Sequence, residues 1–116
     1  MIVDDSSFMR KNLKSNLTKA GHLVVGGAKD GTEGFELYKE TSPDLVIMDV
    51  TMSGTDGIKG ASLIKEYDPK ANIVFMSLVN DPDVKKQADS LGALAYLDKK
   101  DMDGLFQIIN GISGQE

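Results

Sequence analysis

Short apolar runs alternate with amphipathic stretches along the whole chain. The runs span residues 1–3, 23–25, 45–48, 73–76 and 94–97, and several of them are apolar at successive positions rather than at every second one. Continuous apolar runs of this kind are typical of strands that are covered on both faces, as in parallel sheets. The pattern therefore predicts five short buried strands, one at each run.

The stretches between the runs have the apolar spacing of helices. We expect Phe8, Leu13, Leu17 and Ala20 to share the buried face of a first helix, which ends at Gly21. The other helices are indicated by caps, by breakers and by apolar spacing. These signals are Asp30 with Glu33 for the second helix, Ile58, Ala61, Ile64 and Tyr67 before Pro69 for the third, Asp81-Pro82 and Gly92 for the fourth, and Met102, Leu105, Ile108, Ile109 and Ile112 for the fifth.

A strand followed by a helix thus occurs five times in succession. Parallel strands need crossover connections, and right-handed crossovers place helices on both faces of the sheet. We therefore expect an α/β fold, a doubly wound five-stranded parallel sheet with five helices. The length of 116 residues suits a single domain over residues 1–116 and is about half of what a closed eightfold α/β barrel needs.

Composition narrows the function classes. The chain has no cysteine and one histidine, which excludes disulfide scaffolds and thiolate zinc sites and leaves little room for a Ser-His-Asp triad. Its net charge of −5 argues against direct nucleic-acid binding, because attraction to phosphates needs clustered positive charge. No apolar run is long enough for membrane insertion, and no signal peptide is recognisable, so we expect a cytoplasmic location.

Polar residues that could bind a ligand or take part in a reaction follow four of the five apolar runs. Asp4 and Asp5 follow the first run, Asp49 the third, Ser77 the fourth, and Lys99 comes just after the fifth. In open α/β sheets the carboxyl ends of the strands lie along one edge, where binding sites form. The sequence therefore predicts that three carboxylates, a hydroxyl and an amine meet at one edge of the sheet.

Three neighbouring carboxylates repel one another, and they stay ionised only beside a cation. Oxygen ligands without His or Cys point to Mg²⁺, which favours carboxylates, water and phosphate oxygens. A nearby lysine adds a positive charge that suits a bound phosphoryl group, and a carboxylate can itself be the nucleophile that forms an acyl phosphate. This set of residues therefore indicates phosphoryl-transfer chemistry.

The same residues carry a resemblance to a known family. The ordered motifs are Val3-Asp4-Asp5-Ser6, residues 43–49 (Pro-Asp-Leu-Val-Ile-Met-Asp), Met76-Ser77 and residues 92–99, which end in Leu97-Asp98-Lys99. With these motifs the chain resembles a response-regulator receiver domain of the single-domain chemotaxis type over essentially its whole length. The resemblance implies a flavodoxin-like strand order of 2-1-3-4-5. It also implies a phosphorelay role in two-component signal transduction rather than turnover of an external substrate.

The resemblance assigns a role to each site residue. Asp49 is implied as the phosphoacceptor that takes the phosphoryl group of a phosphohistidine on a sensor histidine kinase. Asp5, Asp49 and the main-chain carbonyl of Thr51 are implied as Mg²⁺ ligands, with Asp4 acting through water. Lys99 is implied to pair with Asp49 before phosphorylation and with the phosphoryl oxygens afterwards.

A second implied group forms the switch. Ser77 is expected to turn its hydroxyl toward the phosphoryl group, and Tyr96 to turn inward as Ser77 moves. The added negative charge gives Ser77 and Lys99 a new partner, which biases a two-state surface built from the fourth helix, fifth strand and fifth helix. That surface would bind a downstream effector protein, and hydrolysis of the acyl phosphate would reset it.

Three positions depart from the family pattern. Ser53 and Lys100 stand where the family usually has proline, and we expect the peptide bond before Lys100 to be trans because a non-proline cis bond costs about 2.5–4 kcal/mol. Leu78 stands where the family usually has a small residue. A bulky side chain there is expected to limit access to Asp49, slowing both phosphorylation by small donors and dephosphorylation.

Other functions remain open at this stage. A flavodoxin-like cofactor binder shares the fold, although Asp4 and Asp5 would repel a flavin phosphate. A Mg²⁺-dependent phosphatase usually needs a second acid at the position of Thr51, and a degenerate receiver would bind a partner without phosphorylation. The sequence leaves open the kinase, the effector, the choice between monomer and weak dimer, and whether the chain stands alone or belongs to a larger protein.

Overall fold

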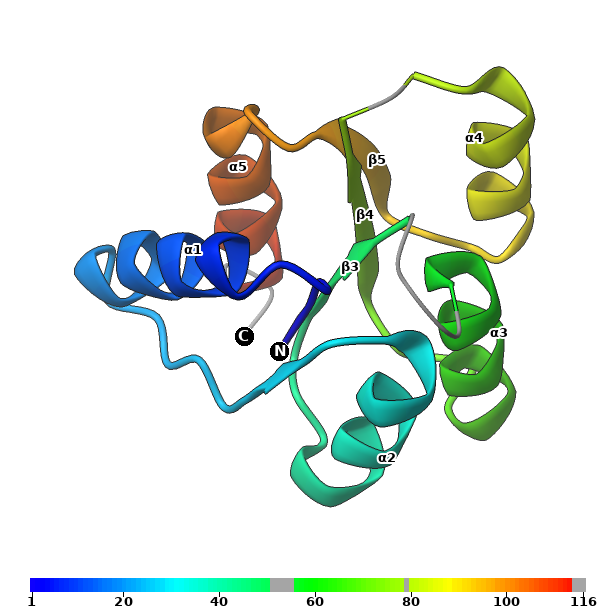
Figure 1. The fold of residues 1–116 in the computed structure, drawn as a ribbon, viewed down its shortest axis with the longest axis horizontal. Coiled ribbons are helices and arrows are strands. Elements are labelled where there is room, and N and C mark those ends of the chain that lie inside the picture. Colours follow the sequence, from blue (N-terminus) through cyan, green and yellow to red (C-terminus); the bar gives the residue numbers. More distant parts are fainter. Residues whose placement is uncertain (51–55, 79, 114–116) are drawn as a thin grey trace.

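The computed structural model describes residues 1–50, 56–78 and 80–113. Strands and helices alternate throughout, as the apolar pattern predicts (Figure 1). The strands are β1 (Ile2–Val3), β2 (Gly27–Ala28), β3 (Val46–Asp49), β4 (Ile73–Ser77) and β5 (Ala95–Asp98). The helices are α1 (Ser7–Lys19), α2 (Gly31–Thr41), α3 (Gly57–Tyr67), α4 (Pro82–Ser90) and α5 (Met102–Ser113).

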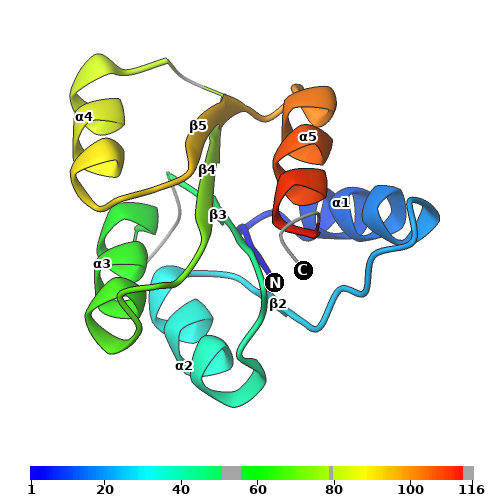
Figure 2. The same cartoon turned by 180° about the vertical axis from the view of Figure 1, so that it is seen from behind.

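All strand pairs are parallel, and the sheet order is β2-β1-β3-β4-β5. The expected doubly wound sheet and its strand order are therefore confirmed. Helices α1 and α5 cover one face of the sheet, and α2, α3 and α4 cover the other (Figures 1 and 2). Since every strand runs the same way, the carboxyl ends of all five lie along a single edge.

Each face of the sheet has its own apolar core. Alternate strand residues supply the two cores because successive side chains of a strand point to opposite faces. The core under α1 and α5 contains Ile2, Leu13, Leu17, Ile47, Val74, Met76 and Leu105. The core under α2, α3 and α4 includes Val3, Tyr38, Met48, Ile64, Phe75 and Ala88. Both faces of the sheet are buried, which explains why the strands read as continuous apolar runs.

The helix boundaries follow from the predicted caps. The Asp30 side chain accepts a hydrogen bond from the Glu33 N–H, and Asp81 accepts one from the Asp83 N–H with Pro82 in the first turn of α4. Gly21 and Gly92 follow α1 and α4 with φ of 91° and 78°, the left-handed region that glycine occupies without strain. The described residues contain no cis peptide bond, so the expected trans bond before Lys100 is confirmed.

The position of the second strand differs from the prediction. The apolar run Leu23–Val25 was expected to form it, but β2 lies at Gly27–Ala28. Register explains the shift, because Ile2 and Val3 of β1 pair with Gly27 and Ala28. Leu23 is left 86% exposed, so apolarity at this edge of the sheet does not mark the paired residues.

The buried face of α1 also differs from the prediction. Leu13 and Leu17 are buried, whereas Phe8 is 74% exposed and Ala20 is the exposed C-cap residue. Phe8 and Leu13 are five positions apart, so their side chains point about 140° away from each other around the helix. Met9, four residues before Leu13, is the half-buried position in that turn.

Tyr67 at the end of α3 is a third difference. It was expected on the buried face, but it is 56% exposed. Its ring contacts Phe35 and Tyr38 edge-on, with centroids 6.0 and 6.4 Å away. Tyr67 therefore covers the outside of an aromatic cluster between α2 and α3, where its hydroxyl can reach water.

The buried amino group of Met1 is expected to make the free energy of unfolding depend on pH. It donates a hydrogen bond to the Leu45 carbonyl at 2.9 Å, and burial lowers its pKa from 8.0 to about 6, against a smaller opposing effect of Asp44. Between these two values the unfolded chain binds the proton and the folded chain does not. The free energy of unfolding should therefore rise by about 2 kcal/mol from pH 6 to pH 8.

Urea unfolding of the protein with a free Met1 amino group, measured at pH 6, 7 and 8, checks this expectation. The matched control is the same chain with an acetylated amino group, which cannot titrate. If both forms showed the same pH dependence, the Met1 amino group would not be its source.

Candidate functional site

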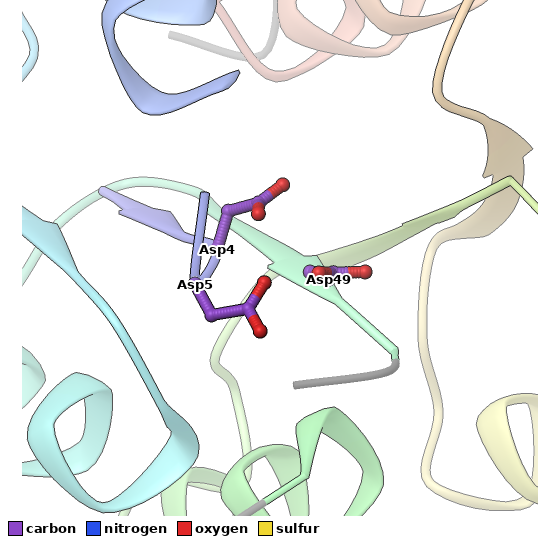
Figure 3. A group of neighbouring side chains, drawn as sticks. All are labelled: Asp4, Asp5 and Asp49. Carbon is purple, nitrogen blue, oxygen red and sulfur yellow. The ribbon is translucent and has the colours of Figure 1, made fainter. Parts of the chain in front are cut away.

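The predicted polar residues meet at the carboxyl edge of the sheet. Asp4 and Asp5 follow β1, Asp49 is the last residue of β3, Ser77 is the last of β4, and Lys99 follows β5. Figure 3 shows the side chains of Asp4, Asp5 and Asp49 gathered beyond the ends of β1 and β3. The three come from two neighbouring strands, because β1 and β3 pair directly with each other.

The three carboxylates form one cluster. One oxygen from each of Asp4, Asp5 and Asp49 lies within 4.8 Å of the other two. Asp4 and Asp49 are 3% and 4% exposed, whereas Asp5 is exposed to solvent. The cluster is thus anchored at the base by two buried acids and is reached from solvent on the side of Asp5. Clustered carboxylate oxygens without nitrogen or sulfur ligands match the ligand preference of Mg²⁺.

Lys99 supplies the positive charge beside the two buried acids. Its Nζ lies 3.0 Å from Asp4 Oδ2 and 3.1 Å from Asp49 Oδ2. Burial by itself lowers the pKa of Lys99, but hydrogen bonds to Asp4 and Asp49 and their charges outweigh it, so the pKa is raised overall. Lys99 is therefore protonated at neutral pH. The ion pair with Asp49 agrees with the sequence analysis, and the equally short pair with Asp4 was not foreseen.

Asp4 also fixes the start of α1. Its Oδ1 accepts a hydrogen bond from the Ser6 N–H at 2.9 Å, and its main-chain carbonyl accepts one from Arg10 Nη1. Ser6 in turn is the N-cap of α1, and its hydroxyl accepts from the Met9 N–H. These contacts hold the carboxylate of Asp4 toward Lys99. No spacing rule indicates from the sequence that Arg10 binds a main-chain carbonyl six residues earlier.

The chain close to Asp49 requires glycine at the start of α3. The Gly57 N–H donates to the Val50 carbonyl at 3.0 Å, and a Cβ at Gly57 would run into the main-chain carbonyl of Asp49. Asp56 caps the helix by accepting from the Lys59 N–H. Glycine therefore lets α3 begin against the end of β3. The expected ligand Thr51 and the departure at Ser53 lie outside the described residues.

Ser77 and Tyr96 lie at the neighbouring part of the same edge. Ser77 is 5% exposed and pairs in register with Asp98, while Tyr96 is half-buried on β5. A cavity of about 290 Å³ lies beside them and is lined by Ser77, Asn80, Lys85, Tyr96 and Asp98. The Lys99 N–H donates to the Ser77 carbonyl at 3.0 Å, so the main chain joins this cavity to the acidic cluster.

Leu78 follows Ser77 and is 66% exposed. Within the part of the chain that the structure describes, no side-chain nitrogen or oxygen is buried without a hydrogen-bond partner. The same residues contain no helix that is long and apolar enough to cross a membrane.

Comparison with known families gives one match over most of the chain. The family described as "Response regulator receiver domain" matches residues 1–110. Among characterised proteins, the chain is 41% identical over 99 residues to the chemotaxis protein CheY of Thermotoga maritima, covering 85% of this chain and 82% of that protein. The chemotaxis protein CheY of Bacillus subtilis is similar to the same extent, also at 41% identity over 99 residues.

Solved structures show the same likeness. A LuxR-family two-component response regulator from Aurantimonas sp. SI85-9A1 superposes with a TM-score of 0.90 at 32% identity, covering 98% of this chain and 84% of that one. The complex of CheX and CheY with BeF₃ and Mg²⁺ from Borrelia burgdorferi gives 0.88 at 32% identity, covering 96% of this chain and 85% of the matched chain.

Proposed function

Because the chain belongs to the response regulator receiver domain family, we propose that Asp49 is its phosphoacceptor. A receiver domain of this family works in two-component signal transduction as a phosphoacceptor module. The observation that supports Asp49 most directly is the position of the Lys99 ammonium, 3.1 Å from the Asp49 carboxylate at the buried base of an acidic cluster. A phosphoryl group transferred to Asp49 would therefore lie next to the positive charge of Lys99.

In the proposed reaction the donor is a phosphohistidine of a sensor histidine kinase. An Asp49 carboxylate oxygen attacks phosphorus, the new O–P bond forms, and the P–N bond to the imidazole breaks with its electron pair left on nitrogen. Lys99 lies beside the attacked group and stabilises the charge on the phosphoryl oxygens. Water later hydrolyses the acyl phosphate, which restores the carboxylate and releases phosphate.

Mg²⁺ fits this site because three carboxylates converge there, and the Lys99 ammonium that contacts Asp4 and Asp49 carries one positive charge. Asp5 and Asp49 would hold the ion directly, Asp4 through water, and the Thr51 carbonyl is the further ligand that we expect. Such an ion would neutralise the carboxylates and the incoming phosphoryl oxygens. Asp5 is exposed and is therefore the ligand that an arriving ion meets first.

Phosphorylation is proposed to switch a surface for a protein partner. Ser77 and Tyr96 both line the 290 Å³ cavity, so a movement of the Ser77 hydroxyl toward the phosphoryl group would free space for the Tyr96 ring. The related CheY of Borrelia burgdorferi forms a complex with CheX, and we propose a protein effector, in chemotaxis or motility signalling, for this chain as well. The net charge of −5 disfavours direct binding to nucleic acid.

Intact-mass spectrometry after incubation with acetyl phosphate tests the proposed function. With Mg²⁺ the protein should gain one phosphoryl group, and with EDTA in place of Mg²⁺ it should gain almost none. The gained group should disappear with time after the donor is removed. A stable mass through all of these conditions, with Mg²⁺ binding intact, would contradict the phosphoacceptor function.

Leu78 gives a separate prediction about rates. It is proposed to screen Asp49, so Leu78→Ala should speed phosphorylation by acetyl phosphate, dephosphorylation, or both. Leu94→Ala is the matched control, since Leu94 is also a large exposed residue at 47% and follows no site residue. Time courses of the phosphorylated mass fraction measure both rates. If Leu78→Ala and the wild type share both rates, Leu78 does not control access.

A further inference from the structure

We propose that the open edge of β2, next to α1, docks an extended acidic segment of a partner protein. The site lies outside the acidic cluster and does not depend on the phosphorylation of Asp49. Two independent observations support it, one from the main chain of the edge strand and one from the charges of the neighbouring helix.

The main chain of β2 offers hydrogen bonds that the sheet does not use. β2 is one of the two edge strands of the sheet and has a neighbour, β1, on one side only. The carbonyls of Gly26 and Ala28 accept from the N–H groups of Ile2 and Asp4. Because successive residues of a strand point their main-chain groups to opposite sides, the N–H and carbonyl of Gly27 point to the open edge. An extended segment can pair there as an added strand.

A groove of about 220 Å³ beside this edge is positively charged. It is lined by Ile2, Arg10, Lys11, Lys14, Val24, Gly26 and Gly27. The lining contains three basic residues and no acidic one, although the chain as a whole carries a charge of −5. Lys11 and Lys14 are exposed, and no carboxylate of the described residues forms an ion pair with either.

Arg10 has a different role in the groove. Its guanidinium donates to the Asp4 carbonyl, and its side-chain stem lies against Gly27, where a Cβ would come 3.4 Å from Arg10 Cδ. Arg10 is therefore held in place as one side of the groove. Lys11 and Lys14 are the positively charged residues that a ligand can contact. The Arg10 stem lies on the face of the sheet at Gly27, so it leaves the N–H and carbonyl of Gly27 directed to the open edge.

The charge decides which occupant fits. A second copy that paired edge to edge about a twofold axis would bring two sets of these basic residues together, and like charges oppose such contact. An extended segment that alternates apolar and acidic residues would pair with Gly27 and lay its carboxylates toward Lys11 and Lys14 on the face of α1, with its apolar side chains on the opposite face of the sheet. Charge complementarity thus favours an acidic partner segment over self-association.

NMR titration of the ¹⁵N-labelled protein with a short capped peptide of alternating Val and Glu tests the proposal. The amide signals of Gly26, Gly27 and Ala28 should shift, together with those of Lys11 and Lys14. A peptide of alternating Val and Lys should leave them unchanged. Asp49→Asn should bind the Val-Glu peptide as the wild type does, which separates this result from any failure of the phosphoacceptor function.

Two variants locate the contact. The double variant Lys11→Glu/Lys14→Glu should weaken binding by about tenfold or more, whereas Lys70→Glu/Lys86→Glu, with the same change in net charge at exposed positions elsewhere, should not. Gly27→Pro removes the N–H at the open edge and should therefore also weaken binding. The variant should still fold, because edge strands tolerate proline. Unshifted edge amides, equal loss in both double variants, or the same shifts with inorganic phosphate alone would overturn the proposal.

Discussion

Replacing Asp49 by Asn should abolish phosphoryl uptake from acetyl phosphate while the protein stays folded. The amide lacks the nucleophilic oxygen charge, so the rate should fall by at least about a hundredfold. The fold should persist because Lys99 keeps its 3.0 Å ion pair with Asp4, and one buried carboxylate is removed from a crowded cluster. Intact-mass spectrometry with Mg²⁺ measures the loss, and a urea unfolding curve checks the fold.

Asp89→Asn is the matched control for this experiment. Asp89 is exposed on α4, away from the acidic cluster, and the change removes the same charge. It should be phosphorylated at the wild-type rate. Uptake by Asp49→Asn at a rate close to that of Asp89→Asn would mean that another residue accepts the phosphoryl group.

Of the substitutions proposed for the acidic cluster, Lys99→Met should lower the free energy of unfolding the most. Lys99 lies between Asp4 and Asp49, which are 3% and 4% exposed, and Met fills a similar volume without charge. Removing one partner of a buried ion pair leaves uncompensated charge, which costs about 3–5 kcal/mol. The free energy of unfolding, measured in urea with EDTA present, should fall by about that amount.

Two comparisons separate this charge effect from lost packing. Mg²⁺ binds the folded protein at the same carboxylates, so it should stabilise Lys99→Met more than it stabilises the wild type. The double variant Lys99→Met/Asp49→Asn has one buried carboxylate fewer and should be more stable than Lys99→Met alone. If neither Mg²⁺ nor the second substitution recovers stability, the cost of Lys99→Met comes from packing.

Much of the fold could be predicted because burial on both faces makes each central strand a continuous apolar run. The runs at 45–48 and 73–76 coincide with the buried central strands β3 and β4 within one residue, and the run at 94–97 coincides equally well with β5, a half-buried edge strand. Helix caps such as Asp30 and Asp81 could also be predicted from the sequence, because each side chain accepts a hydrogen bond from an N–H group only two or three residues away. Local chemistry and burial on both faces are therefore visible in one sequence.

The edge of the sheet at β2 could not be predicted in the same way. β2 is buried less than the central strands, and its position is set by the register of β1 rather than by apolarity. The exposure of Phe8 has a related cause, because a five-residue spacing to Leu13 takes it off the buried face. Pairing partners and helix rotation depend on the assembled structure.

The sequence predicts which residues lie at this edge of the sheet better than it predicts the contacts between them. Parallel strands bring their carboxyl ends to one edge, so Asp4, Asp49, Ser77 and Lys99 had to arrive near one another. Which carboxylate Lys99 reaches depends on the path of a long side chain, and the structure shows it between both buried acids. The role of Gly57 beside the Asp49 carbonyl likewise appears only when α3 is placed.

The most direct test of the account is to identify the phosphorylated residue by chemical trapping. After incubation with acetyl phosphate and Mg²⁺, reduction with borohydride converts an aspartyl phosphate into homoserine, which tandem mass spectrometry of peptides can locate. We expect homoserine at position 49 and at no other aspartate, and none when Mg²⁺ is replaced by EDTA. Homoserine at position 4 or 5, or a phosphoryl group that survives reduction on a hydroxyl residue, would contradict it.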